Sequence, residues 1–274
     1  MKTPVLSAPL GLLLCLLAAP APAGEIAAAD LPGLIAAAAP EVLVLGEVHD
    51  NAAHHQNQAL AVAALAPRAL VFEMLTPDQA ARVTPDLRTR PEDLGKALGW
   101  EEAGWPDFAL YAPIFAAAPD AVIVGAALPR EEVRRAMKEP LAKVFPDAAR
   151  FGLDRPYPPE LQAALEAETQ ENHCNALPPE MLPGMVAAQR LRDAALAEAS
   201  LRALKATTGP VALITGSGHA RTDRAVPAMI AQAAPGRVVV SLGQLESPVE
   251  GPQPFDWWIV TSPAEREDPC KAFQ

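Results

Sequence analysis

Residues 42–51, VLVLGEVHDN, decide the fold class of this 274-residue chain. An apolar run extends without a polar interruption from Val42 to Gly46, and charged and polar side chains follow it at once. Such a continuous run is typical of a strand that is buried on both faces of a parallel sheet. Open α/β sheets bind their ligands beyond the carboxyl ends of these strands. We therefore expect a buried strand that ends in a functional loop.

The same kind of short apolar run recurs along the chain, separated by alanine- and leucine-rich stretches with helical spacing. The predicted strands are Val42–Gly46, Ala69–Met74, Ala121–Gly125, Val211–Thr215, Arg237–Leu242 and Trp257–Thr261. The predicted helices are Asn57–Ala66, Phe108–Ala117, Arg130–Met137, Pro159–Glu171, Met181–Lys205 and Arg224–Ala233. This alternation predicts an α/β fold with a mostly parallel sheet and helices on both faces. Prolines interrupt it after residue 140, so we expect one domain at residues 24–274 with a helical insertion at about 140–204.

The first 23 residues have the pattern of a secretory signal peptide. A lysine near the start, an apolar stretch from Val5 to Ala19 and small residues at 21–23 fit a cleavable signal. The alternative is a lipoprotein signal acylated at Cys15, but Leu14 stands where such a site requires a small residue. We therefore expect a periplasmic or secreted protein that is not anchored to a membrane.

Charge excludes one class of partner. The chain has 33 acidic residues against 22 Lys and Arg, a formal net charge of -11, and no basic stripe. Binding to nucleic acid relies on clustered Lys and Arg that neutralise phosphates, so no nucleic-acid partner is expected.

Two cysteines, Cys174 and Cys270, remain once the signal is removed. In an oxidising compartment an even number of cysteines favours a disulfide, which would pin the carboxy-terminal tail to the segment after the predicted helix at 159–171. The alternative is a pair of free thiols.

Polar side chains gather at the ends of three predicted strands. Glu47 and His49 follow the first strand, Glu73 follows the second, and Gly216-Ser217-Gly218-His219 follows the fourth. The carboxyl ends of parallel strands share one edge, so these groups are expected to converge. Imidazoles and carboxylates suit a divalent metal such as Zn, Mn or Co, and they equally suit general acid–base catalysis. The alternative for Glu47 and His49 is a buried structural pair.

His54 and His55 come next, at the start of a predicted helix. Adjacent residues do not share one helix face, so at most one of them is expected to join the polar edge. For His55 the alternative is a purely structural place in a helix start that Asn51 caps.

Aromatic residues are concentrated in one stretch. They are Trp100, Trp105, Phe108, Tyr111 and Phe115. Core packing is their expected role, and an exposed apolar platform for a flat ligand or a second subunit is the alternative. Tyr111 stands apart because a phenolate can ligate ferric haem iron.

Four stretches resemble the motifs of one known family. They are Leu45-Gly46-Glu47-Val48-His49-Asp50-Asn51 with His54, His55 and Gln58; Trp105-Pro106-x-Phe108-x-x-Tyr111-x-Pro113; His173-Cys174 followed by Met185-x-x-x-Gln189-x-x-x-Asp193; and Gly216-Ser217-Gly218-His219-Ala220-Arg221-x-Asp223-x-x-Val226-Pro227. The family that the chain resembles is the ChaN-like haem-binding uptake family, part of the Tiki superfamily. The similarity extends from Val42 to the tail.

The resemblance implies an iron-regulated envelope protein that binds haem, in some members as stacked haems at a homodimer interface with tyrosine on the iron. For this chain it implies Tyr111 as the axial ligand, with Tyr157 in reserve, and His54 or His55 assisting at the pocket. Arg130 would meet a haem propionate through charge-assisted hydrogen bonds. The alternative for Arg130 is a solvated helix face.

The wider superfamily also contains metal-dependent peptidases and esterase-like enzymes. The corresponding residues of this chain are Glu47, His49, Glu73 and His219, which would hold a metal or act directly on water. A metal enzyme needs Glu47, His49 and His219 within coordination distance, whereas a haem protein needs a tyrosine at an apolar pocket. We expect haem binding and handling in iron uptake, with the metal-dependent hydrolase as the alternative.

Overall fold

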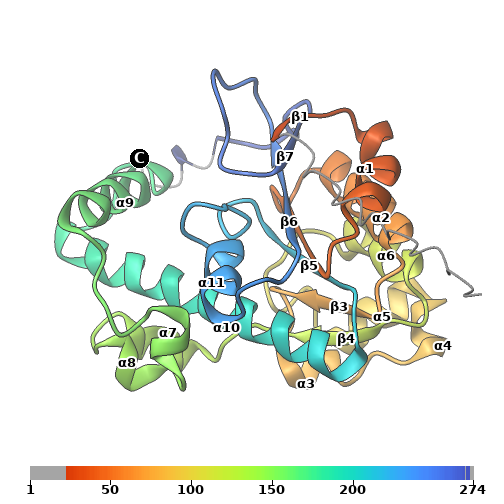
Figure 1. Ribbon diagram of the computed structural model, residues 1–274, viewed down its shortest axis with the longest axis horizontal. Coiled ribbons are helices and arrows are strands. Elements are labelled where there is room, and N and C mark those ends of the chain that lie inside the picture. The colour runs from red at the N-terminus through yellow and green to blue at the C-terminus, as the bar shows by residue number, and fades with distance from the viewer. Residues whose placement is uncertain (1–22, 269, 272–274) are drawn as a thin grey trace, which may run out of the picture.

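A computed structural model describes residues 23–268, 270 and 271 of the chain. The predicted signal peptide, apart from its last residue, lies outside these residues. The strands of the described chain are β1 (Gly24–Glu25), β2 (Val42–Glu47), β3 (Ala69–Phe72), β4 (Val122–Gly125), β5 (Val211–Gly216), β6 (Val239–Leu245) and β7 (Trp257–Val260). They form one sheet in the order β1-β7-β6-β2-β5-β3-β4, and all neighbouring pairs are parallel (Figure 1). The predicted α/β fold is confirmed.

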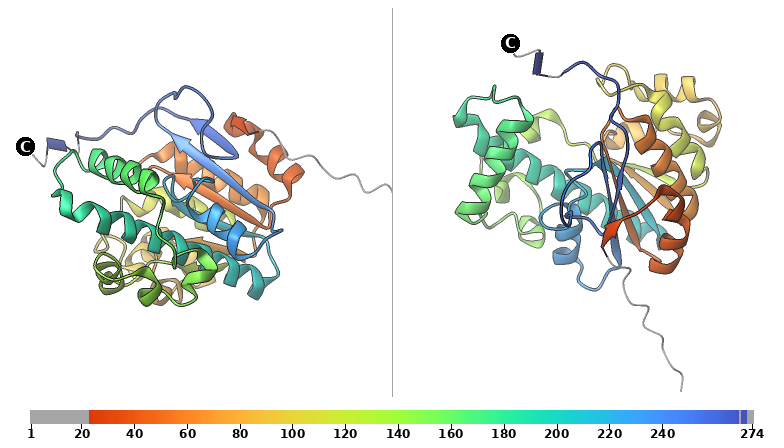
Figure 2. Two further views of the ribbon diagram at one scale, coloured as in Figure 1. Left: turned by 60° about the vertical axis from the view of Figure 1, so that its left-hand side comes forward. Right: turned by 90° about the horizontal axis from the view of Figure 1, so that it is seen from above.

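Helices cover both faces of this sheet, as the edge-on view in Figure 2 shows. The α-helices are α1 (Leu31–Ala38), α2 (Ala52–Leu65), α3 (Pro77–Ala80), α4 (Pro85–Arg88), α5 (Pro91–Leu98), α6 (Phe108–Ala117), α7 (Arg130–Ala136), α8 (Leu141–Val144), α9 (Pro159–Asn172), α10 (Leu182–Thr207) and α11 (Val226–Ala233). None of the described helices is long and apolar enough to cross a membrane.

Alternate residues of β2 face two separate hydrophobic cores. Val42 and Val44 belong to the core beneath α10 and α11, whereas Leu43 and Leu45 belong to the core beneath α1, α2 and α6. Successive side chains of a strand point to opposite faces, so a strand covered on both sides must be apolar throughout. This is why VLVLG is one uninterrupted apolar run.

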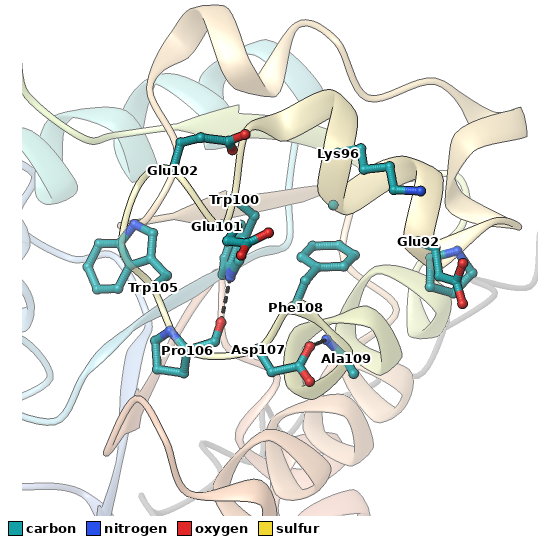
Figure 3. Close-up of a pocket in the computed structure, with 12 residues that line it drawn as sticks. Glu92, Lys96, Trp100, Glu101, Glu102, Trp105, Pro106, Asp107, Phe108 and Ala109 are labelled. Carbon is teal, nitrogen blue, oxygen red and sulfur yellow. Dashed lines mark hydrogen bonds between the residues drawn. The ribbon is translucent and has the colours of Figure 1, made fainter.

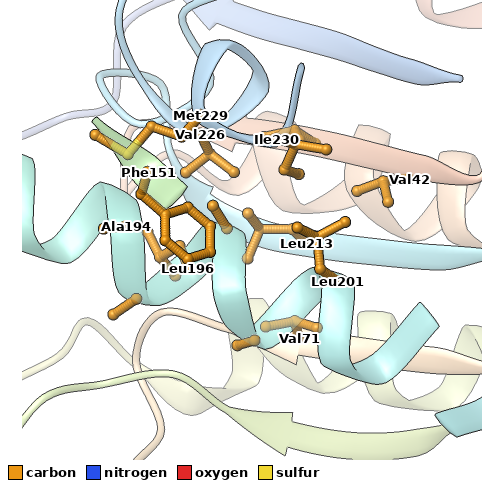
Figure 4. Close-up of a cluster of buried hydrophobic side chains, with 14 of the residues drawn as sticks. Val42, Val71, Phe151, Ala194, Leu196, Leu201, Leu213, Val226, Met229 and Ile230 are labelled. Carbon is orange, nitrogen blue, oxygen red and sulfur yellow. The ribbon is translucent and has the colours of Figure 1, made fainter. Parts of the chain in front are cut away.

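The predicted helical insertion contributes to the main core. In Figure 4, Leu196 and Leu201 of α10 lie with Leu213 of β5 and Val71 of β3 in one buried cluster. By contrast, α9 has no buried residue. α10 therefore covers one face of the sheet, although it lies within the segment that the sequence assigns to an insertion.

The predicted disulfide is present. Cys174, just after α9, is bonded to Cys270, 96 positions later in the sequence, with the two Cα atoms 5.4 Å apart. It holds the carboxy-terminal tail against the end of α9.

The centre of the sheet brings three predicted polar strand ends together. β5 lies between β2 and β3, and the register places Glu47 opposite Gly216. A Cβ atom on Gly46 would lie 2.8 Å from Oγ and 2.9 Å from Cα of Ser217, so only glycine fits there. The loop after β5 therefore packs directly on the end of β2.

Candidate functional site

Glu47 is the buried centre of the first polar cluster. Its Oε1 accepts hydrogen bonds of 2.7 Å from the Tyr111 hydroxyl and 2.7 Å from Nδ1 of His49. Its Oε2 lies 3.3 Å from Nδ1 of His55 but has no well-formed hydrogen bond among the described residues. Burial raises the pKa of Glu47, but the interactions with His49 and His55 outweigh burial. The pKa is therefore below its usual value, and the group is a carboxylate.

Tyr111 is fully buried in this cluster. Its ring packs against His55 at 4.2 Å and Trp100 at 4.7 Å between centroids. Burial, followed by the negative charge of Glu47, raises the pKa of the phenol far above its usual value. The structure thus shows Tyr111 as a neutral proton donor to Glu47. Its role as an iron ligand stays a prediction, and it would require this hydrogen bond to break.

His54 and His55 hold the loop after β2 in place. Nδ1 of His54 accepts a 2.8 Å hydrogen bond from the amide of Val48, and its Nε2 bonds Thr261 Oγ1 at 2.9 Å. Nε2 of His55 donates to the carbonyl of His49 at 2.9 Å. Both rings are buried, and burial lowers the pKa of His54 to about 4, so that ring is neutral. Their assistance to haem also stays a prediction.

The second polar cluster joins β3, β5 and α10. Oε2 of Glu73 accepts hydrogen bonds of 2.7 Å from Thr215 Oγ1 and 2.9 Å from the amide of Gly216. Its Oε1 lies 3.4 Å from Nε2 of His219, while Nδ1 of His219 bonds Asp193 at 2.6 Å. His219 is therefore held between two carboxylates.

This arrangement keeps His219 protonated at neutral pH. Burial lowers its pKa, but the charges of Glu73 and Asp193 outweigh burial and raise it to about 10. Burial raises the pKa of Glu73, and the charge of His219 more than offsets it, leaving the pKa well below its usual value. The result is a buried imidazolium at the edge of the sheet.

His49 lies between the two clusters and is the most accessible of these groups. Its side chain is 35% exposed, and its ring lies 5.0 Å from that of Trp105. Gly216 provides space for it, because a Cβ atom there would lie 3.3 Å from Nε2 of His49. Burial lowers the pKa of His49, and the hydrogen bond to Glu47 and the charge of Glu73 raise it beyond its usual value.

The predicted metal ligands are bonded to other side chains in this structure, and a metal there stays a prediction. Within the part of the chain that the structure describes, no three His, Cys, Asp or Glu side chains are arranged to hold one ion. Glu47 and His49 bond each other, and His219 bonds Asp193. The residues present therefore fit hydrogen-bonded acid–base pairs better than Zn, Mn or Co.

The aromatic stretch forms a cavity of about 560 Å³, shown in Figure 3. Trp100, Trp105 and Phe108 line it, and the indole of Trp100 donates a 2.7 Å hydrogen bond to the carbonyl of Pro106. Charged side chains such as Glu92, Lys96 and Glu101 also line it, and no tyrosine, histidine or methionine of the described residues does, so the usual protein ligands of haem iron are not found in its described lining.

A second cavity, of about 400 Å³, is lined by Tyr157, and we call it the Tyr157 cavity. His173, Met185 and Arg190 line it beside Tyr157. Nδ1 of His173 donates a 2.7 Å hydrogen bond to the carbonyl of Thr169. In this tautomer Nε2 carries a free lone pair. Neither this Nε2 nor the Tyr157 hydroxyl has a hydrogen-bond partner among the described residues.

The guanidinium of Arg190 stacks 4.0 Å from the centroid of the Tyr157 ring. Burial raises the pKa of the Tyr157 phenol, and the positive charge of Arg190 opposes this rise. The Tyr157 side chain is only partly buried, unlike that of Tyr111.

One sequence signal pointed to this region without a role being assigned. Met185, Gln189 and Asp193 are four residues apart, so they share one face of α10. That face lines the Tyr157 cavity and reaches His219, whose ring nitrogens lie 3.2 Å from the Gln189 amide. Asp193 is a partner of His219 that sequence reasoning missed.

A third cavity, of about 430 Å³, opens over Glu73 and His219; we call it the arginine cleft. Arg130, Arg134 and Arg192 line it. Arg130, the predicted propionate partner, therefore lies beside the acid–base groups.

A family model identifies the family of this chain, and a solved structure shows the same fold. The model of the family described as "Haem-binding uptake, Tiki superfamily, ChaN" matches residues 34–230. The structure is similar to that of ChaN of Campylobacter jejuni, solved for its cofacial haem binding, with a TM-score of 0.64 and 19% identity over 84% of this chain and 91% of that chain. The type III effector HopBA1 is more distant, with a TM-score of 0.46 and 13% identity over 86% of this chain and 94% of that chain. No curated protein matches.

The family match covers the strands from β2 to β5, and with them both polar clusters and the Tyr157 cavity. The protein therefore belongs to the ChaN-like haem-binding uptake family of the Tiki superfamily.

Proposed function

We propose that this protein binds ferric haem at the Tyr157 cavity and serves in haem or iron uptake. The observation that carries the proposal is a partly exposed phenol beside an imidazole with a free Nε2 in one cavity. Phenolate and imidazole are both established ligands of haem iron, and membership of the family supports haem as the cofactor. In this assignment Tyr157 replaces Tyr111, whose hydroxyl is buried against Glu47.

The surroundings of Tyr157 fit the remaining parts of a haem. Leu165, Met185 and Val186 supply apolar surface for the porphyrin. Arg192 lines the same cavity and would hold a propionate through charge-assisted hydrogen bonds. Arg190 donates to the carbonyls of Gly152 and Arg155 and supports the Tyr157 ring by stacking on it.

We further propose that the haem is shared between two copies of the chain. ChaN of Campylobacter jejuni binds haem cofacially. The Tyr157 cavity is open and small for a whole porphyrin, so one face of the ring would be left for a second haem to cover. Export to an oxidising compartment is consistent with the disulfide and with the signal-like start of the chain.

A haemin titration of residues 24–274 tests these assignments. We expect a saturable Soret shift with phenolate charge-transfer bands that are lost in Tyr157→Phe and kept in Tyr111→Phe. The reverse pattern would return the ligand role to Tyr111. No saturable shift would overturn haem binding. Sedimentation with and without haemin tests the dimer, which should form only with haem.

The Glu47–His49 pair favours a second candidate, acid–base hydrolysis without a metal. Nδ1 of His49 donates to Glu47 at 2.7 Å, so Nε2 is left to take a proton from water on the accessible side.

An ester and peptide hydrolysis screen tests this candidate in the presence of a chelator. Activity that resists chelation and falls about 10²-fold or more in His49→Gln would support it. This candidate would be overturned if activity required added metal, or if no hydrolytic activity were found. Haemin binding, measured on the same variant, should be unchanged.

A further inference from the structure

The arginine cleft concentrates positive charge that the rest of the chain does not neutralise. Among the described residues, five of the arginines have no ion pair or hydrogen bond through the guanidinium group: Arg68, Arg130, Arg134, Arg192 and Arg202. Three of these, Arg130, Arg134 and Arg192, line the one cleft. Arg130 and Arg134 are exposed and Arg192 is half-buried, so all three guanidinium groups are available to a ligand in the cleft.

Nearby carboxylates do not neutralise these three arginines. Glu131 and Glu132 stand on the same helix as Arg130 and Arg134 but form no ion pair with either. Arg135, on that helix too, is paired with Glu139 at 3.1 Å and does not line the cleft. The carboxylate of Glu73, at the floor, is already bonded to Thr215 and Gly216.

The floor and one wall add features of a ligand site. His219 lies beside its partner Glu73 at the floor of the cleft. Trp105 forms an apolar wall, and its ring also contacts that of His49. A ligand with an oxyanion among the arginines and a flat body on Trp105 would reach the acid–base groups.

We infer that the arginine cleft binds a small molecule that carries an oxyanion, a phosphate monoester or a carboxylate, next to an apolar or aromatic body. Planar guanidinium groups bind such oxyanions in a bidentate manner. Arg192 also lines the Tyr157 cavity, whereas Arg130 and Arg134 line the cleft alone, so binding here does not require haem at Tyr157. Only the further step, reaction at His49, rests on the acid–base candidate above.

Phenyl phosphate is the test ligand, with titration calorimetry and Trp fluorescence as readouts on residues 24–274. Arg134→Gln and Arg192→Gln should each weaken binding about tenfold, since a hydrogen bond to a charged group contributes about that much. Arg202→Gln, which removes the same charge from an arginine that does not line the cleft, should leave the affinity unchanged. Circular dichroism and thermal melting check that each variant is folded.

Three results would overturn the inference: no saturable binding, equal loss in Arg202→Gln, or equal affinity for the neutral benzyl alcohol.

Competition separates the two sources of oxyanion. If haemin displaces phenyl phosphate and both ligands weaken in Arg134→Gln, the oxyanions are haem propionates. If haemin binds Arg134→Gln normally, the ligand is a separate small molecule. Loss of haemin binding in Tyr157→Phe, with phenyl phosphate binding intact, would show that the two sites are independent.

Discussion

The hydroxyl of Tyr111 donates a 2.7 Å hydrogen bond to Oε1 of Glu47, which lies 64 residues earlier in the chain, and both side chains are buried. The other oxygen of Glu47 has no hydrogen-bond partner among the described residues. Its hydrogen bonds come from Tyr111 and His49, and the ring of His55 lies 3.3 Å from its second oxygen.

Tyr111→Phe should lower the free energy of unfolding by about 1–3 kcal/mol, because it withdraws a donor from a buried carboxylate. Urea denaturation measures this loss. Tyr157→Phe is the matched control, since the Tyr157 hydroxyl has no partner among residues 23–268, 270 and 271. Equal stability of Tyr111→Phe and the wild type would mean that Glu47 does not depend on this bond.

The stability of the protein should fall as pH rises from about 6.5 to about 10. The pKa of His219 is raised from 6.5 to about 10 on folding, so its contribution is fully present below pH 6.5 and is lost as pH rises through about 10. Urea denaturation across this range measures the slope. His219→Gln should be less stable at pH 6.5 and should show a flatter profile, whereas parallel profiles for the two proteins would contradict the assignment.

Removal of the disulfide should destabilise the chain strongly. Cys174 and Cys270 are 96 residues apart in sequence, and a loop of this size corresponds to about 4–5 kcal/mol in the chain-entropy model. Cys174→Ser, Cys270→Ser and the double variant should be equally destabilised in urea. Addition of a reductant should lower the stability of the wild type to the same level but leave the variants unchanged.

Gly46→Ala should destabilise the protein by about 1–3 kcal/mol, because the added methyl group overlaps Ser217 and the carbonyl of Leu242. Gly33→Ala is the matched control. A Cβ atom there meets nothing within 4 Å, and Gly33 lies in α1, so alanine should stabilise by about 0.5–1 kcal/mol. Thermal melting of the two variants should shift in opposite directions, and a shift in the same direction would contradict this packing.

Much of the architecture was predictable because its signal is local. Each predicted strand from Val42–Gly46 to Trp257–Thr261 is found in the sheet, since a strand covered on both faces must be apolar along its whole length. β1 was missed because its two residues, Gly24 and Glu25, are too few to show a pattern. The helices α3, α4 and α8, of four residues each, were missed for the same reason, and the eight-residue helices α1 and α5 were missed as well.

The polar edge was predictable only in part. Glu47, His49, Glu73 and His219 could be placed together, because they follow strands whose carboxyl ends share one edge of a parallel sheet. Their individual roles depend on side chains that are remote in sequence. Asp193, from α10, is bonded to His219, and Tyr111, from α6, is bonded to Glu47.

The sequence by itself determined the α/β class, the strand ends that form the polar edge and the pairing of Cys174 with Cys270, since apolar runs, their endings and the number of cysteines can be read along the chain. Only the tertiary structure decided which tyrosine is accessible, which histidine is held as an imidazolium and which arginines have no partner. The physical reason is that burial and neighbouring charge set these properties, and both arise from contacts between distant segments.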